Sequence, residues 1–156
     1  MIAGGVGLAP FATLAQALRA RGVATALFYG ARRAEELFYL DFFQQLDVEL
    51  VLTTEDGSAG ERGRVVAPLD RRLAALPAAS AVMLYACGPE GMLAATAKTA
   101  MAYDRPCEVS VERIMGCGLG GCYSCVVPMR GGDGAYHHVR ACLAGPVLAA
   151  DQIRWD

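Results

Sequence analysis

Three cysteines in one short loop are the residues whose type and spacing most clearly indicate chemistry. Cys117, Cys122 and Cys125 are separated by four and then two residues, and Cys142 follows after sixteen more. A C-x4-C-x2-C group with one distant cysteine is the plant-type ligand pattern of a [2Fe–2S] cluster. The spacing therefore predicts that these four thiolates ligate two irons.

Glycine surrounds the first two cysteines, at Gly116, Gly118, Gly120 and Gly121. A loop that turns several thiolates onto one cluster needs backbone φ values that glycine adopts at low cost. Its N–H groups must also point at the sulfurs, because these hydrogen bonds help to set the reduction potential. The glycines therefore support the cluster as much as the cysteines do.

Structural zinc is the main alternative, since four cysteines also make an all-thiolate zinc site. Zinc ribbons usually present two separate C-x2-C pairs, whereas three of the cysteines here share one loop. A disulfide framework fits poorly with a long, aliphatic-rich chain in which no signal-peptide pattern is found. The adjacent His137 and His138 would face opposite sides of a strand, which argues against a Rieske site.

The bulk composition is that of a compact globular protein. The chain has 156 residues, of which 54% are hydrophobic, and a formal net charge of −2. This charge predicts no binding to nucleic acid or to an acidic membrane surface. No apolar run approaches the roughly 20 residues of a membrane span. We expect a cytoplasmic protein, because a reducing compartment keeps thiolates available for a cluster.

A glycine-rich turn near the N-terminus is the second motif that could do chemistry. The letters M-I-A-G-G-V-G-L-A-P run from a strand into an amphipathic helix predicted over 10–19. Glycines let a ligand approach the backbone, and a helix N-terminus offers N–H donors to a pyrophosphate. Only Met1 to Ala3 precede the glycines, whereas strands usually have about five or six residues. We therefore expect the chain to begin inside a longer protein.

Strands then alternate with helices. The predicted elements are strand 23–30, helix 34–46, strand 48–53, helix 65–76, strand 81–87 and helix 88–103. This alternation predicts an α/β fold with a doubly wound, mostly parallel sheet. Ligands bind such sheets beyond the carboxyl ends of the strands, so the loops G-G-V-G-L-A-P, Y-G-A-R and C-G-P-E-G-M are expected at one edge.

The character of the sequence changes after Pro106. A strand over 107–111 leads into the cysteine loop, and strands over 125–129 and 136–140 flank a G-G-D-G hairpin turn. We therefore expect a nucleotide-binding domain over 1–105 and a small β-rich cluster domain over 106–156. In so short a segment, the metal substitutes for a core that it cannot build alone.

Three motifs, G-G-V-G-L-A-P, C-G-P-E-G-M and C-x4-C-x2-C-x16-C, occur in this order. Together they resemble the electron-transfer subunit of two-subunit, NAD-dependent dihydroorotate dehydrogenases, in the ferredoxin–NADP reductase superfamily. The loop E-R-I-M-G-C-G-L-G-G-C-Y-S-C-V-V is similar to that subunit's form, and the resemblance covers essentially the whole chain. Flavoproteins of the sulfide dehydrogenase or ferredoxin-NADP oxidoreductase type, and a non-enzymatic zinc-stabilised nucleotide-binding module, remain alternatives.

The resemblance implies an electron path in pyrimidine biosynthesis. Electrons would leave the FMN of a catalytic dihydroorotate dehydrogenase subunit, cross the cluster, reach FAD and reduce NAD+, within a heterotetramer. FAD connects a one-electron cluster to a two-electron nicotinamide. The flavin-binding barrel of the family has no room in these residues, so we expect no activity from the chain alone. An apolar rim formed by Met115, Leu119, Tyr123 and Leu143 is the expected docking face for the partner.

The resemblance also assigns the site residues. The cluster ligands would be Cys117, Cys122, Cys125 and Cys142. The pyrophosphate turn would be Gly4, Gly5, Val6, Gly7, Leu8, Ala9 and Pro10. Cys87, Gly88 and Pro89 would lie near the nicotinamide ring. Gly30 and Arg32 belong to the Y-G-A-R loop, which the parallel sheet is expected to bring to the same edge. Cys107 has no partner in the pattern and is expected to be a buried thiol.

The choice between NAD and NADP depends on charge near the adenosine ribose. The superfamily reads this group just after the third strand, where Glu55 and Asp56 stand. These acids would repel a 2′-phosphate and accept hydrogen bonds from ribose hydroxyls. Arg32 and Arg33 after the second strand argue mildly the other way. We predict NAD.

Overall fold

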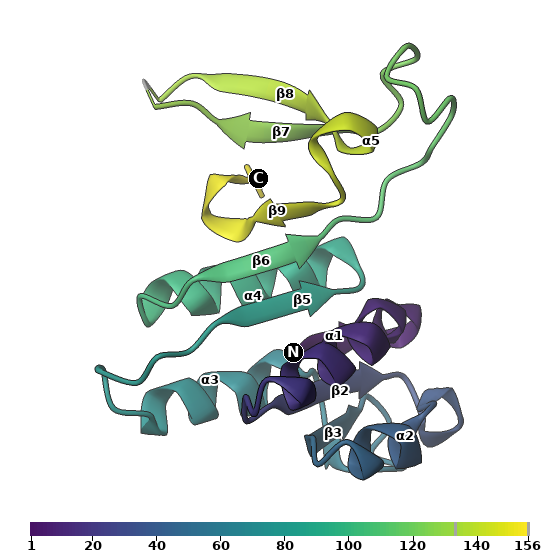
Figure 1. The fold of residues 1–156 in the computed structure, drawn as a ribbon, viewed down its shortest axis with the longest axis vertical. Coiled ribbons are helices and arrows are strands. Elements are labelled where there is room, and N and C mark those ends of the chain that lie inside the picture. Colours follow the sequence, from purple (N-terminus) through teal and green to yellow (C-terminus); the bar gives the residue numbers. More distant parts are fainter. Residues whose placement is uncertain (133, 156) are drawn as a thin grey trace.

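The computed structural model describes residues 1–132 and 134–155 (Figure 1). The elements up to residue 102 are β1 (Ile2–Gly4), η1 (Gly5–Leu8), α1 (Ala9–Ala20), β2 (Ala26–Ala31), η2 (Ala34–Glu36), α2 (Leu40–Gln45), β3 (Glu49–Thr54), β4 (Glu61–Arg62), α3 (Val66–Ala75), β5 (Leu84–Cys87) and α4 (Glu90–Ala102). The elements that follow are β6 (Cys107–Ser110), β7 (Val126–Arg130), β8 (Tyr136–Arg140), α5 (Ala141–Ala144), β9 (Val147–Ala149) and η3 (Ala150–Gln152).

The described strands form one large sheet and one hairpin. The sheet has the order β4-β3-β2-β1-β5-β6-β9, and its strands pair in parallel except for β9, which is antiparallel to β6. The chain moves outward from β1 to β4, returns to the other side of β1 as β5, and continues to β6. This reversal at β1 is the doubly wound arrangement, so the predicted fold class is confirmed.

The two faces of the sheet carry different helices. Leu27 and Tyr29 of β2 pack in one buried cluster with Phe11 of α1 and Phe43 of α2. Phe28, between them, belongs to a second cluster that includes residues of α3 and α4. Because successive side chains of a strand point to opposite faces, α1 and α2 cover one face of the sheet and α3 and α4 cover the other.

The predicted helix over 34–46 is wrong as a continuous element. The chain forms the short turn η2, becomes extended at Leu37, and resumes as α2 after Tyr39, whose φ is +58°. The hydroxyl of the buried Tyr29 donates to the Glu36 carbonyl at 3.0 Å and accepts from the N–H of Phe38 at 3.5 Å. A continuous helix would use this carbonyl and this N–H in its own hydrogen bonds. The contact with Tyr29 therefore prevents the helix that the spacing of apolar residues predicts.

The cysteine-bearing part shares a core with the sheet. Val109 of β6, Leu93 of α4, Val127 of β7 and Ile153 belong to one buried cluster. β9 pairs with β6, as in Glu108↔Ala149. The sequence patterns did not predict β9, α5 or η3. The predicted hairpin is present as β7 and β8, whereas its turn over 131–134 includes Asp133, which lies outside the described residues.

Within residues 1–132 and 134–155, no helix combines the length and the apolar character that crossing a bilayer requires.

Close packing leaves room only for glycine at Gly7, in the turn after β1, and this gives a direct test of the fold. A Cβ at Gly7 would lie 2.2 Å from the Cys87 carbonyl oxygen, whereas a Cβ at Gly91 would meet nothing within 4 Å. We expect Gly7→Ala to lower the free energy of unfolding by about 2–3 kcal/mol through overpacking. Gly91→Ala, in the first turn of α4, should change it by less than about 1 kcal/mol. Urea unfolding followed by circular dichroism measures both, and equal midpoints would contradict this packing.

Candidate nucleotide and iron–sulfur sites

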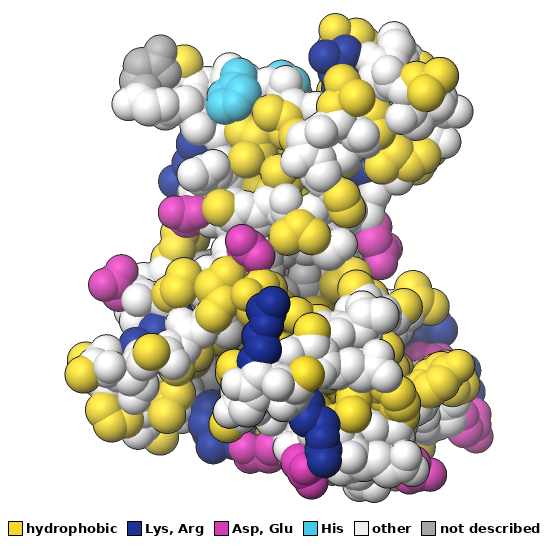
Figure 2. Space-filling model, viewed as in Figure 1, with side chains coloured by type: hydrophobic (Ala, Val, Ile, Leu, Met, Phe, Trp, Pro, Cys, Tyr) yellow, Lys and Arg dark blue, Asp and Glu magenta, His cyan; other side chains and the backbone are white. Residues whose placement is uncertain are grey.

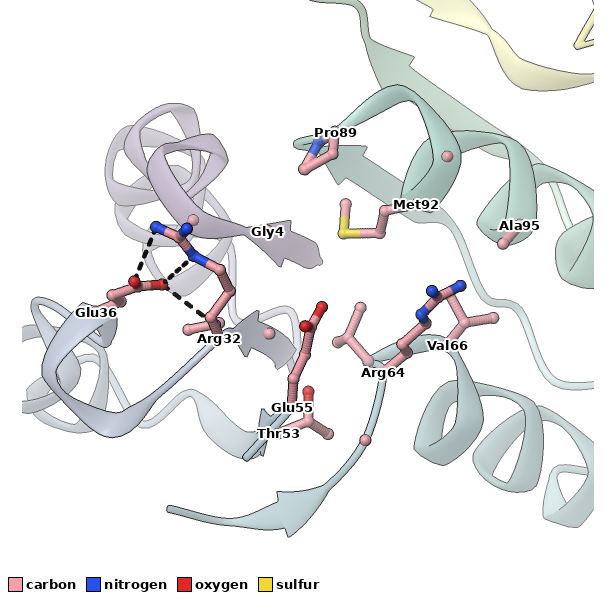
Figure 3. Close-up of a pocket in the computed structure, with 16 residues that line it drawn as sticks. Gly4, Arg32, Glu36, Thr53, Glu55, Arg64, Val66, Pro89, Met92 and Ala95 are labelled. Atoms are coloured by element: carbon pink, nitrogen blue, oxygen red, sulfur yellow. Dashed lines mark hydrogen bonds and ion pairs between the residues drawn. The ribbon is translucent and has the colours of Figure 1, made fainter. Parts of the chain in front are cut away.

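A cavity of about 530 Å³ opens at the carboxyl ends of the parallel strands (Figure 3). It is lined by residues that follow β1, β2 and β3 and by the start of α4, including Gly5, Arg32, Glu55 and Met92. Its volume lies within the range of about 300–1,000 Å³ that small-molecule and cofactor sites occupy. The glycine turn, the second loop and the C-G-P turn therefore meet at one edge, as predicted.

Glycines form the floor of this cavity because side chains would fill it. Gly4 and Gly30 are register partners on adjacent strands. A Cβ at Gly4 would lie 2.8 Å from both Met92 Sδ and Pro89 Cδ. A Cβ at Gly30 would lie 3.0 Å from Val65 Cβ and 3.2 Å from Thr53 Oγ1. A ligand in the cavity can therefore lie directly on the backbone.

Only some of the predicted nucleotide residues line the cavity. Those that do are Gly4, Gly5, Gly30, Arg32, Glu55 and Pro89. The turn after β1 is helical from Gly5, since η1 runs directly into α1. Leu8 is buried, whereas Ala9 and Pro10, at the start of α1, are exposed. Val6 is 85% exposed and faces solvent.

The remaining predicted residues serve packing or the local loop. Gly7 and Gly88 allow the first turn and the C-G-P turn to touch, since a Cβ at Gly88 would lie 3.0 Å from Gly4 Cα. Cys87 is buried at the end of β5, and this burial raises the pKa of its thiol. The Asp56 carboxylate accepts from the N–H of Ser58 at 2.9 Å and from its hydroxyl at 2.6 Å, which shapes the loop after β3.

Three cavity residues with functional groups were not predicted from the sequence: Glu36, Thr53 and Arg64. Thr53 is 1% exposed, and its hydroxyl has no hydrogen-bond partner within the described residues. Arg64 follows β4, across the cavity from Arg32 (Figure 3). No motif includes these positions, although Thr53 lies in β3, two residues before the predicted Glu55.

The loop between β6 and β7, green at the upper right of Figure 1, surrounds Cys117 with backbone donors. Its Sγ accepts from the N–H groups of Leu119 at 3.4 Å, Gly121 at 3.3 Å and Cys122 at 3.4 Å. The N–H of Cys122 is the main cause that lowers the pKa of the Cys117 thiol to about 6. Positive φ at Gly118 and Gly120 allows this inward orientation.

The four thiols of the pattern meet as two pairs. Cys117 interacts with Cys122, and Cys125 interacts with Cys142. The N–H and thiol of Cys142 lower the pKa of Cys125, and this thiol contact raises the pKa of Cys142. Within the described residues, no three His, Cys, Asp or Glu side chains converge on one metal-ion position.

The donor set and its surroundings fit an iron–sulfur cluster. Anionic sulfurs that accept several backbone N–H bonds are typical of thiolate ligands. A Cβ at Gly116 would lie 2.9 Å from Cys122 Sγ, so glycine is needed beside that sulfur. His137 and His138 are both exposed on β8, and Cys107 is buried, as predicted.

Arg140 of β8 braces the cysteine loop from the side. Its guanidinium donates to the Gly120 carbonyl at 2.5 Å and lies 4.7 Å from the centre of the Tyr123 ring. Tyr123 itself adopts a φ of +61° between two of the cysteines. This contact was not predicted, because it joins positions distant in the sequence.

A bidentate ion pair links the two sites. Arg113, just before the cysteine loop, donates to the Glu90 carboxylate at 3.1 and 3.2 Å. Glu90 is the first residue of α4 and directly follows Pro89 in the nucleotide edge. Two parallel N–H bonds to one carboxylate add geometric specificity. The ion pair therefore helps to fix the cysteine loop relative to the cavity.

Exposed apolar side chains gather on the cysteine loop, in the upper right of Figure 2. The predicted rim residues are exposed by 49% (Met115), 86% (Leu119), 60% (Tyr123) and 59% (Leu143). Ile114 and Val147, which were not predicted, are exposed by 83% and 51%. Clustered apolar exposure of this kind marks interaction surfaces.

Two family models match separate parts of the chain. Residues 1–98 match the model of the oxidoreductase NAD-binding domain. Residues 112–154 match the model of the iron-sulfur cluster binding domain of dihydroorotate dehydrogenase B. The predicted boundary between 105 and 106 falls between the two matched ranges and stays a prediction.

Two similar proteins are named as electron transfer subunits. The probable dihydroorotate dehydrogenase B (NAD(+)), electron transfer subunit, of Archaeoglobus fulgidus is 39% identical over 99% of this chain and 61% of its own length. The corresponding subunit of Desulforamulus reducens is 36% identical over 99% of this chain and 57% of its own length. The chain thus spans about three fifths of these relatives.

A solved structure of an NADH-dependent reduced ferredoxin-NADP oxidoreductase has a similar chain. It is 30% identical, with a TM-score of 0.81, and the match covers 99% of this chain and 53% of that chain. The nucleotide sheet and the cysteine-bearing part therefore occur together in related oxidoreductases.

The contribution of Arg140 to the stability of the cysteine loop can be tested on the iron-loaded protein. We expect Arg140→Ala to accelerate loss of the cluster to a chelator at least about tenfold, since a hydrogen bond from a charged donor contributes about 1.5–3 kcal/mol. Arg154→Ala is the matched control, because Arg154 lies 4.3 Å from the Tyr136 ring, away from the cysteine loop. Bleaching of visible absorption gives both rates. Equal rates would show that Arg140 does not stabilise the loop.

Proposed function

Because this chain belongs to the family of oxidoreductase NAD-binding domains and ends in an iron–sulfur cluster binding domain, we propose that it acts in an electron-transfer subunit of dihydroorotate dehydrogenase B. The full-length subunit would pass electrons from a catalytic partner to NAD+, in pyrimidine biosynthesis. The observation that carries this proposal is the arrangement of the four thiols. They interact in two pairs, and the Cys117 sulfur accepts from several backbone N–H groups. The segment that holds them shares its buried core with the sheet that forms the nucleotide cavity. We propose a cytoplasmic location, where thiolates stay reduced.

Each part of the cysteine loop has a role in this proposal. Cys117, Cys122, Cys125 and Cys142 would hold the cluster, and the thiols of Cys117 and Cys122, and of Cys125 and Cys142, already interact. The cluster, when bound, supplies one-electron transfer. The N–H groups around Cys117 stabilise negative charge on its sulfur, and Arg140 keeps the loop in this shape.

The residues at the cavity would bind and orient NAD. Backbone N–H groups at the start of η1 would face the pyrophosphate across Gly4 and Gly5. Glu55 would accept from a ribose hydroxyl. Pro89 and the C-G-P turn would lie beside the nicotinamide ring, with Met92 excluding water from it.

A flavin is needed between the two sites, because nicotinamide takes a hydride whereas an iron–sulfur cluster takes single electrons. We propose FAD on a β-barrel domain of the full-length protein. The relatives named as electron transfer subunits are longer than this chain, which leaves length for such a domain. The proposed path from the cluster to NAD+ would run through that domain.

The proposed partner is an FMN-bearing catalytic subunit, assembled with this one into a heterotetramer. The apolar rim around the cysteine loop supports this proposal, since electron transfer needs close approach of the partner to the cluster. A second candidate is a reductase of the ferredoxin-NADP oxidoreductase type, which the similar solved chain favours. The two differ in which partner protein reduces the cluster.

One variant at the cluster tests the proposed function. In the complete complex of the full-length subunit and its catalytic partner, we expect Cys122→Ser to lower dihydroorotate-dependent reduction of NAD+ at least about a hundredfold, because one iron loses a thiolate ligand. Reduction of an artificial dye at the catalytic subunit should stay normal. Cys107→Ala is the control, since Cys107 lies outside the pattern and is buried. Unchanged NAD+ reduction in Cys122→Ser would refute the proposal.

A charge at the rim tests the docking face. We expect Leu119→Asp to weaken binding of the catalytic subunit at least about tenfold, because a carboxylate would be desolvated at an apolar contact. Val23→Asp provides the control, as Val23 is also exposed but follows α1, away from the cysteine loop. Titration of the two purified subunits gives both affinities. Equal affinities would place the interface elsewhere.

A further inference from the structure

Two arginines follow β2 in the sequence, beside the cavity, and free guanidinium groups there would attract a 2′-phosphate. The side chains of Arg32 and Arg33 are 76% and 58% exposed, and Arg32 lines the cavity. Sequence alone counts both in favour of NADP. Whether their guanidinium N–H groups can bind a phosphate depends on the contacts that these side chains already make.

One carboxylate engages both arginines (Figure 3 shows the pair with Arg32). The Glu36 carboxylate lies 3.2 Å from Arg32 Nε and 2.9 Å from an Arg32 terminal nitrogen, and it also accepts from the Arg32 N–H at 3.2 Å. Arg33 Nε lies 3.6 Å from the same carboxylate. The guanidinium of Arg32 therefore already has the two-pronged partner that a phosphate would otherwise supply.

The position of Glu36 is set by the buried core. The hydroxyl of Tyr29, which is fully buried, donates to the Glu36 carbonyl at 3.0 Å. The same contact interrupts the predicted helix and creates η2, and this turn brings the Glu36 side chain back beneath Arg32. The Glu36 side chain is only 26% exposed, so the ion pair is partly shielded from solvent.

The other charged residues that line the cavity are Glu55 and Arg64. Figure 3 shows Glu55 pointing up between Arg32 and Arg64. Within the described residues, neither side chain forms an ion pair. Glu55 thus leaves an acceptor for a hydroxyl and adds negative charge that opposes a phosphate.

We infer that Glu36 makes this cavity select NAD over NADP, by occupying the guanidinium donors of Arg32 and Arg33 that would otherwise bind a 2′-phosphate. A 2′-phosphate entering here would have to displace the Glu36 carboxylate, whereas a 2′-hydroxyl leaves the ion pair intact. This inference rests on the proposed binding of NAD in the cavity and names the residue that discriminates.

The test compares NAD+ and NADP+ binding to the full-length flavoprotein by calorimetric titration. We expect Glu36→Gln to raise the affinity for NADP+ relative to NAD+ at least about tenfold, because it releases two cations beside the 2′-position. This gain should shrink with added salt, since it depends on exposed charges. Glu35→Gln is the matched control: Glu35 lies 4.0 Å from Arg33 and is 84% exposed, so the ratio should stay within about twofold.

A double variant identifies the released cation. Glu36→Gln combined with Arg32→Gln should return the affinity ratio toward that of the wild type, and a gain that persists would overturn the role given to Arg32. An unchanged ratio in Glu36→Gln, with NAD+ still bound by the wild type, would refute the selectivity inference alone. Absence of NAD+ binding to the wild type would refute the proposed function together with the inference.

Discussion

Strand β6 pairs with β5 on one side and with β9 on the other, and the arrangement of both sites depends on this ladder. The segment that carries the cysteines is too short to bury a sufficient core of its own. It instead shares a buried cluster with α3, α4 and the sheet. The ion pair between Arg113 and Glu90 adds a polar contact between the cysteine loop and the nucleotide edge. The two sites are therefore held at a fixed separation.

Backbone N–H groups surround a sulfur at the cysteine loop, and we propose that they also face the pyrophosphate at the cavity. Around Cys117, three N–H groups point at one sulfur, and glycines with positive φ make this possible. At the cavity, the turn after β1 begins a helical segment at Gly5, and Gly4 and Gly30 keep the floor free of side chains. Glycine serves the same purpose at both, because each site needs a charged group to approach the main chain.

Local patterns predicted the fold class and the family correctly. The cysteine spacing, the glycine turns and the alternation of strands with helices are all short-range features, and the family matches and the sheet order confirm the conclusions drawn from them. Contacts between distant residues were missed. The bond from Tyr29 to Glu36 broke a helix that apolar spacing predicted, and it placed Glu36 at the cavity. Arg140 reaches Gly120 from another strand, which no spacing rule predicts. The ligand roles of the four cysteines stay a prediction.

We propose that this loop holds a two-iron cluster rather than a single metal ion. The most direct measurement is the iron and acid-labile sulfide content of the full-length protein after anaerobic reconstitution, together with its metal content as purified. We expect about two irons and two sulfides per chain, with visible absorption that bleaches on reduction. About one zinc per chain, without sulfide and without colour, would contradict it.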